Sequence, residues 1–181
     1  MKVLLVDNFC SFTGNIYAAL KRQGAIVSVV PPQKLDDESF DRIVIGPGPG
    51  EPKDVQIIKD QIPFLKTPLL GICLGHQLIA AAYGADIIRA SRPFHGKQSL
   101  ISHHFVHFPE NLKVGRYHSL IVKASTLPEY VKPVAWAGNE IMALKHSSLK
   151  QTGLQFHPDS FLTQSGDEFF KQFLNYGEIP C

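Results

Sequence analysis

The sequence is poor in several residue types, and each shortage excludes a class of protein. Only three cysteines occur in 181 residues, at widely spaced positions (Cys10, Cys73 and Cys181). They cannot form a disulfide framework, and such sparse use is typical of a reducing compartment. The 18 basic and 16 acidic residues give a net charge of +2, so there is no basic field for nucleic acid or a membrane surface.

Long apolar runs are also missing. The apolar segment at the start of the sequence, Met1 to Val6, ends at Asp7 and is too short for a signal peptide or a membrane span. We therefore expect an intracellular, cytoplasmic protein. No glycine- or serine-rich linker divides the chain, and 181 residues suffice for one well-packed domain over 1–181.

The order of apolar runs and turn residues predicts the fold class. Up to Gly84, strands and helices alternate, which favours an α/β fold with a parallel sheet covered on both faces. After Gly84, short runs separated by turns predict a mixed or antiparallel part. Expected strands cover 2–6, 25–30, 42–45, 68–72, 86–89, 97–101, 113–117, 120–123, 134–137, 141–145 and 152–156; expected helices cover 15–22 (capped by Thr13), 55–64, 74–83 and 166–174.

Cys73 lies where a buried strand turns into a helix. Gly71 and Gly75 flank it and leave the backbone room for a sharp turn, as in the nucleophile elbow of hydrolases. The positive end of the following helix favours the thiolate, which is the reactive form. The alternative is an inert, buried structural cysteine.

A second segment supplies a base. In Gln155-Phe156-His157-Pro158-Asp159, the proline biases His157 toward an extended backbone, where residues two apart point the same way. Asp159 can then orient the His157 ring, which completes a nucleophile, base and acid arrangement with Cys73. The adjacent His76 does not share the helix face of the sulfur, so we expect a structural role for it.

A third segment, Gly46-Pro47-Gly48-Pro49-Gly50, follows the strand 42–45 and offers backbone N–H groups suited to an oxyanion. A phosphate-binding loop is disfavoured because no Gly-Lys-Ser/Thr follows and prolines remove donors. His103, His104 and His107 could suggest a metal site, but no ligand pattern accompanies them, so a hydrogen-bonded loop is favoured.

These segments, in this order, resemble the class I glutamine amidotransferases. Val6-Asp7-Asn8-Phe9, Ser11-Phe12-Thr13 and Arg116-Tyr117-His118-Ser119-Leu120 narrow the resemblance to the glutaminase subunits of anthranilate and aminodeoxychorismate synthases. It spans about residues 2–177 and implies a flavodoxin-like fold. It also implies that Cys73 attacks the side-chain amide of L-glutamine and forms a thioester, with His157 as proton donor and acceptor.

The resemblance further implies the remaining site residues and the partner. The oxyanion donors would be the N–H groups of Leu74 and Gly50. Glutamine would be bound by six residues: Gly48, Pro49, Gly50, Gln77, Ser119 and Leu120. No metal or other cofactor is implied, and ammonia would pass to a larger chorismate-binding synthase subunit. The two pathways, to anthranilate or to aminodeoxychorismate, share these motifs and are not distinguished.

Two positions depart from the family pattern. Asp159 stands where glutamate is usual, one methylene shorter, and Cys10 stands where the opening motif usually has an acid. Because Cys10 is distant in sequence from Cys73, we expect it to affect loop structure or partner contact rather than chemistry. The alternatives are a stand-alone hydrolase of γ-glutamyl compounds and a docking subunit that has lost catalysis.

Overall fold

The computed structural model describes residues 1–181 and is built on an eight-stranded sheet in the order β2-β1-β3-β4-β12-β11-β10-β7. Its strands are β1 (Lys2–Val6), β2 (Ile26–Val30), β3 (Arg42–Ile45), β4 (Leu69–Ile72), β7 (Ser102–His103), β10 (Val131–Ala137), β11 (Glu140–His146) and β12 (Gln151–Leu154). Pairing from β2 to β12 is parallel and from β12 to β7 antiparallel. The predicted change of pattern after Gly84 is therefore confirmed.

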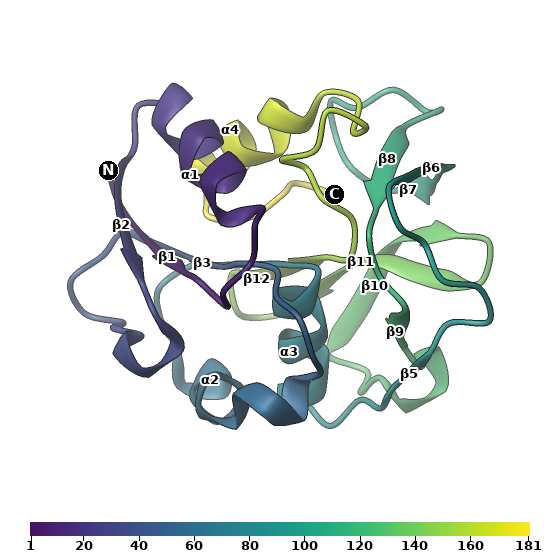
Figure 1. Cartoon of the computed structure of the whole chain (residues 1–181), viewed down its shortest axis with the longest axis horizontal. Helices are drawn as coiled ribbons and strands as arrows, with labels where there is room; N and C mark the ends of the chain where they lie inside the picture. Colours follow the sequence, from purple (N-terminus) through teal and green to yellow (C-terminus); the bar gives the residue numbers. More distant parts are fainter.

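Two small antiparallel sheets flank the main sheet. One pairs β5 (Ile87–Arg89) with β9 (Leu120–Val122), and the other pairs β6 (Lys97–Leu100) with β8 (Lys113–Arg116). Both lie beside the antiparallel half of the molecule (Figure 1). They place the segment between β8 and β9 close to the carboxyl ends of the parallel strands.

Helices cover both faces of the sheet. Helices α1 (Thr13–Arg22) and α4 (Gly166–Tyr176) lie on one face, and α2 (Gln56–Gln61) and α3 (Leu74–Ala82) lie on the other (Figure 1). Alternation along β1 explains this: Val3 and Leu5 pack in the core with α1 and α4, whereas Leu4 and Val6 pack with α2 and α3. None of the helices combines the length and apolar character that crossing a bilayer requires.

Two local expectations need correction. Thr13 does not cap α1; Phe12 is the N-cap residue without a side-chain bond, and the Thr13 hydroxyl instead donates to Asp7 at 2.6 Å. The expected helix over 55–64 is only partly α-helical. One-turn 3₁₀ helices, Pro52–Val55 and Ile62–Phe64, flank the short α2 because Pro52 and Pro63 sit in their first turns.

Candidate active site

Cys73 joins β4 to α3 in a strained turn. Its φ of 54° and ψ of −98° are uncommon for a residue with a side chain, and such strain clusters at functional sites. Its backbone N–H donates to the Leu154 carbonyl at 2.8 Å, which ties the turn to β12. The predicted elbow is confirmed.

The two flanking glycines are required by close packing. A Cβ on Gly75 would lie 2.2 Å from the Ile45 carbonyl oxygen, and one on Gly71 would lie 2.4 Å from the Gly75 carbonyl oxygen. Neither position has room for a side chain. The helix can therefore begin immediately after Cys73, with its N-terminus directed at the sulfur.

His157 and Asp159 lie beside Cys73. The backbone of His157 is fixed between two elements, because its N–H donates to Gly115 of β8 and its carbonyl accepts from the Thr163 hydroxyl. His157 Nδ1 is 3.3 Å from Asp159 Oδ1, and both side chains are buried. Neither atom meets the geometry of a hydrogen bond, so the contact is an ion pair with poor alignment.

Aromatic rings hold the imidazole in place. The Phe12 and Tyr117 ring centroids lie 4.8 and 5.0 Å from that of His157. Burial by itself lowers the pKa of His157, but Asp159 and Cys73 outweigh this effect and raise the pKa to about 9. His157 is therefore an imidazolium at neutral pH.

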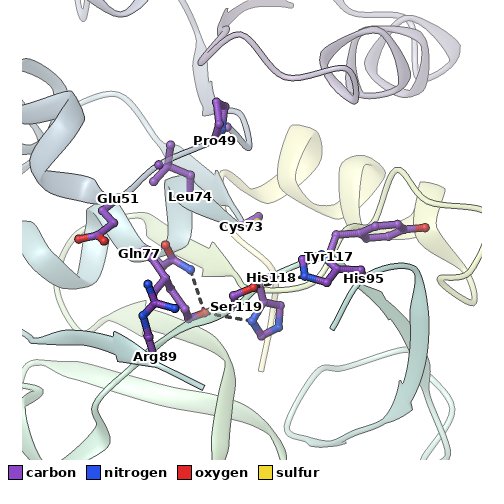
Figure 2. Close-up of a pocket in the computed structure, with 13 residues that line it drawn as sticks. Pro49, Glu51, Cys73, Leu74, Gln77, Arg89, His95, Tyr117, His118 and Ser119 are labelled. Atoms are coloured by element: carbon purple, nitrogen blue, oxygen red, sulfur yellow. Dashed lines mark hydrogen bonds between the residues drawn. The ribbon is translucent and has the colours of Figure 1, made fainter. Parts of the chain in front are cut away.

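Cys73 lies between two cavities. The first, here the Gln77 cavity, has a volume of about 450 Å³ and is lined by Gly48, Pro49, Gly50, Glu51, Cys73, Leu74, Gln77, Arg89, His95, Tyr117, His118, Ser119 and Leu120. All six residues expected to bind glutamine are among them. Figure 2 shows Glu51, Gln77 and Arg89 together on one side of this cavity and Tyr117 and His95 on the other.

The second, the His157 cavity, has a volume of about 430 Å³ and lies on the other side of the sulfur. Its lining is Phe9, Cys10, Ser11, Phe12, Pro47, Gly48, Pro49, Cys73, Tyr117 and His157. Cys10 thus faces the same cavity as Cys73, although 62 positions separate them in the sequence. Cys10 is therefore close to Cys73 in the folded chain, and the expectation that it affects loop structure or partner contact rather than chemistry stays a prediction.

The glycine and proline loop 46–50 packs closely against this turn. The Asn8 amide donates to the Gly46 carbonyl at 2.8 Å, and a Cβ on Gly48 would lie 2.5 Å from the Asn8 Cβ. Gly50 has a φ of 85°, and its N–H has no acceptor within the protein. The N–H of Leu74, the first residue of α3, has no acceptor within that helix. Gly50 and Leu74 both line the Gln77 cavity, and the backbone N–H of each is available to a ligand.

His76 and His103 have structural contacts. His76 is fully buried against Gly153 of β12, and burial lowers its pKa to about 4. His103 accepts the N–H of Phe105 at Nδ1 and donates from Nε2 to the Pro109 carbonyl. His103 ends strand β7, so the expected loop is wrong for this residue, although its ring is hydrogen-bonded as expected.

Sequence reasoning assigned no chemical role to Gln155 or His118. The fully buried Gln155 side chain donates from Nε2 toward the Cys73 sulfur at 3.8 Å and accepts from Gln77 at 3.1 Å. Its position two residues before His157, directly after the strand β12 that pairs with β4, is the signal that could have identified it.

Comparison with known proteins agrees with this geometry. The profile of the family "Glutamine amidotransferase class-I" matches residues 4–176. The chain is 39% identical to anthranilate synthase component 2 of Pseudomonas putida (96% of each chain) and 39% identical to aminodeoxychorismate synthase component 2 of Serratia marcescens (96% of this chain, 99% of that one). It is also 39% identical to the aminodeoxychorismate/anthranilate synthase component 2 of Bacillus subtilis, over 95% of each chain.

Solved structures show the same fold. A putative GMP synthase protein from Thermoplasma acidophilum superposes with a TM-score of 0.88 at 25% identity, over 98% of this chain and 94% of that one. A glutamine amidotransferase from Thermotoga maritima gives a TM-score of 0.70 at 20% identity, over 97% of this chain and 82% of that one. The chain belongs to the class I glutamine amidotransferases.

Proposed function

We propose that the protein is a glutaminase subunit that hydrolyses L-glutamine and delivers ammonia to a larger, chorismate-using synthase subunit. The observation that carries the proposal is the place of Cys73, at a strained turn between one cavity lined by Gln77 and another lined by His157. The similarity to component 2 of two chorismate-derived pathways supports the class of partner.

In the proposed reaction, glutamine lies in the Gln77 cavity. The Cys73 sulfur forms a bond to the amide carbon, and the carbonyl oxygen becomes an oxyanion that accepts from the N–H groups of Leu74 and Gly50. Each such donor typically contributes about 10²–10³ in rate. Arg89 and Glu51, at one side of the cavity, carry charges opposite to the α-carboxylate and α-ammonium of glutamine.

His157 then acts first as an acid. As an imidazolium it protonates the departing nitrogen, the carbon–nitrogen bond breaks, and ammonia and a glutamyl thioester result. The neutral imidazole next takes a proton from water, which attacks the thioester and releases glutamate. Because His157 lines only the second cavity, ammonia leaves on that side of the sulfur, past Phe12 and Pro47.

The decisive experiment uses a Cys73→Ala variant in complex with its synthase partner. The complex should lose glutamine-dependent synthesis and keep synthesis from added ammonium salts. A glutamine-like chloroketone should label Cys73 of the wild-type protein. An inert thiol would support a docking subunit instead, and rapid turnover of γ-glutamyl compounds without a partner would support a stand-alone hydrolase.

A further inference from the structure

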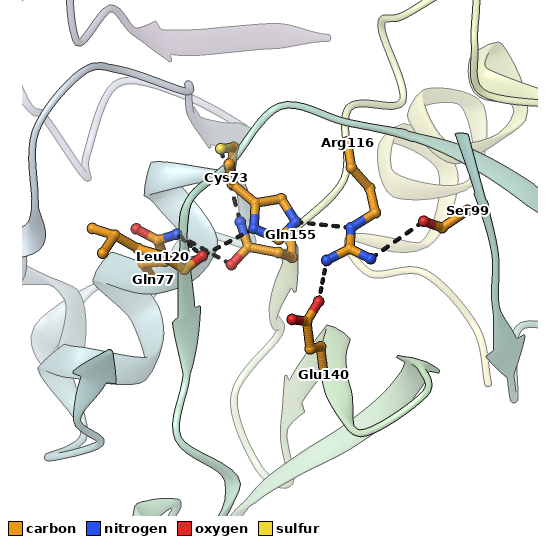
Figure 3. A network of polar contacts seen from close by, with 8 residues as sticks. Cys73, Gln77, Ser99, Arg116, Leu120, Glu140 and Gln155 are labelled. Carbon is orange, nitrogen blue, oxygen red and sulfur yellow. Dashed lines mark hydrogen bonds and ion pairs between the residues drawn. The ribbon is translucent and has the colours of Figure 1, made fainter. Parts of the chain in front are cut away.

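A chain of polar contacts runs from β11 to the wall of the Gln77 cavity (Figure 3). Its central residue is Arg116, which ends β8 and is only 2% exposed. The guanidinium forms an ion pair with Glu140, donates to the Ser99 hydroxyl at 3.2 Å, and lies 3.5 Å from the centroid of the Phe94 ring. These contacts on several sides hold the Arg116 side chain in one orientation.

Arg116 fixes the tautomer of His118. Its Nε donates to His118 Nε2 at 3.1 Å, and because a guanidinium cannot accept, Nε2 must carry no hydrogen. The single imidazole hydrogen is then on Nδ1, which lies 3.0 Å from the Leu120 carbonyl oxygen and donates to it. Burial, followed by the nearby Arg116 charge, lowers the pKa of His118 to about 3, in agreement with a neutral ring.

The Leu120 carbonyl oxygen also accepts a hydrogen bond from Gln77 and so links His118 to that residue. Gln77 Nε2 donates one hydrogen to Leu120 and the other to Gln155 Oε1, both at 3.1 Å. Both amide hydrogens are therefore used. Gln77 Oε1 accepts no bond within the protein, and the residue lines the cavity. The fixed amide thus offers an acceptor to an N–H donor in the cavity.

We propose that Arg116 and His118 are positioning residues for substrate binding, which act through the Leu120 carbonyl to fix the amide of Gln77. With His118 as the Nδ1–H tautomer, Gln77 presents Oε1 to an N–H donor of the bound amino acid. A ring with its hydrogen on Nε2 would leave Leu120 without that donor and would free the Gln77 amide to turn. The proposal rests on glutamine being the ligand of this cavity, as proposed above.

The tautomer is tested without any catalysis. Long-range ¹H–¹⁵N spectra of the uniformly ¹⁵N-labelled protein, with His118 assigned by its loss in a His118→Asn variant, should show a protonated Nδ1 and an unprotonated Nε2. These signals should not titrate between pH 7 and pH 5. A hydrogen on Nε2, or titration near pH 6.5, would overturn the proposal even if glutamine hydrolysis is normal.

Two matched amide variants test the effect on binding. In His118→Asn the amide nitrogen reaches the position of Nδ1 and keeps a donor for Leu120, whereas in His118→Gln it reaches that of Nε2 and does not. A buried group left unpaired weakens binding, so the KM for glutamine should rise about tenfold in His118→Gln with little change in kcat. In His118→Asn the rise should stay within about threefold.

Controls separate this role from general destabilisation. Tyr83→Phe removes a hydrogen bond of 2.9 Å to Gln151 away from both cavities and should leave the KM unchanged. Synthesis from ammonia by the complex should be normal in all three variants. Equal KM values in the Asn and Gln variants would overturn the proposal. A wild-type complex that uses ammonia but not glutamine would instead overturn the proposed function, while the tautomer would still report on His118.

Discussion

His157 Nδ1 lies 3.3 Å from Asp159 Oδ1, yet both Asp159 oxygens lack a hydrogen-bond partner. The shorter acid approaches the ring without an aligned bond, and it is one of the two groups that raise the pKa of His157. This distinguishes the pair from a triad in which the acid also fixes the ring by a directed hydrogen bond. Phe12 and Tyr117 take over part of that orienting role.

Neutralising Asp159 should therefore change the pH profile more than the ring position. Asp159→Asn removes one of the interactions that raise the pKa of His157 to about 9, so the imidazolium is lost at lower pH. The basic limb of kcat against pH should move to lower pH. Turnover at pH 7 should fall by about 10- to 100-fold, less than the roughly 10⁴-fold loss in an aligned serine protease triad. Steady-state kinetics of the complex from pH 6 to pH 10 measures both quantities.

Asp159→Glu is the matched control because it keeps the charge. Its basic limb should stay near that of the wild type. A large loss of turnover in this variant would show that the buried site is built around the shorter acid. An unchanged pH profile in Asp159→Asn would contradict the assignment of the His157 pKa to this carboxylate.

The glycines around Cys73 predict opposite effects of the same substitution. Gly75→Ala places a methyl group 2.2 Å from a carbonyl oxygen of β3 and should destabilise the fold by at least about 2 kcal/mol. Gly14→Ala in α1 meets nothing within 4 Å and should stabilise by about 0.5–1 kcal/mol. Urea unfolding of the two variants beside the wild type checks this. Similar stabilities would show that the turn can relax around an added side chain.

Local rules account for the parts of the site that sequence could predict. The elbow at Cys73 follows from a buried strand, two glycines and a helix that are adjacent in the sequence. His157 and Asp159 meet in a turn in which the Ser160 N–H donates to the His157 carbonyl, and not in the extended segment that the X-Pro rule predicted. In contrast, the place of Cys10 in the lining of the His157 cavity depends on which loops the sheet order brings together. The same holds for the chain of polar contacts from Arg116 to Gln77. A clue was present in Arg116 and His118, two polar residues spaced to share one side of an extended chain.

Burial of His76 predicts that the fold loses stability in acid. The pKa of His76 falls from 6.5 to about 4 on folding because burial disfavours its charged form. Between these pH values the unfolded chain binds more protons than the folded one, so stability is full above pH 6.5 and falls as the pH drops toward 4. The loss is about 1.4 kcal/mol per pH unit for this residue.

His76→Leu removes this dependence at similar side-chain volume. Relative to the wild type, the variant should gain about 2 kcal/mol of stability when the pH is lowered from 7 to 5. Urea unfolding at the two pH values gives this difference directly and cancels contributions from other groups. The same stability difference at both pH values would show that His76 titrates normally in the folded protein.

The cysteines should differ sharply in their reaction with alkylating agents. Burial raises the pKa of Cys10, and Cys73, Asp159 and Asp7 raise it further; burial also raises the pKa of Cys181. Both are therefore thiols at neutral pH, whereas Cys73 lies at a helix N-terminus next to an imidazolium. One equivalent of iodoacetamide at pH 7 should modify Cys73 first, as peptide mass spectrometry can show.

A Cys10→Ser variant is the control for this labelling, because Cys10 shares a cavity with Cys73. The rate of modification at Cys73 should be the same in the variant and in the wild type, since a neutral Cys10 thiol neither competes for the reagent nor carries a charge that acts on Cys73. If Cys10 reacts first, or if Cys10→Ser changes the Cys73 rate several-fold, then the two sulfurs interact directly. Cys10 would then belong to the reaction chemistry rather than to the wall of the cavity.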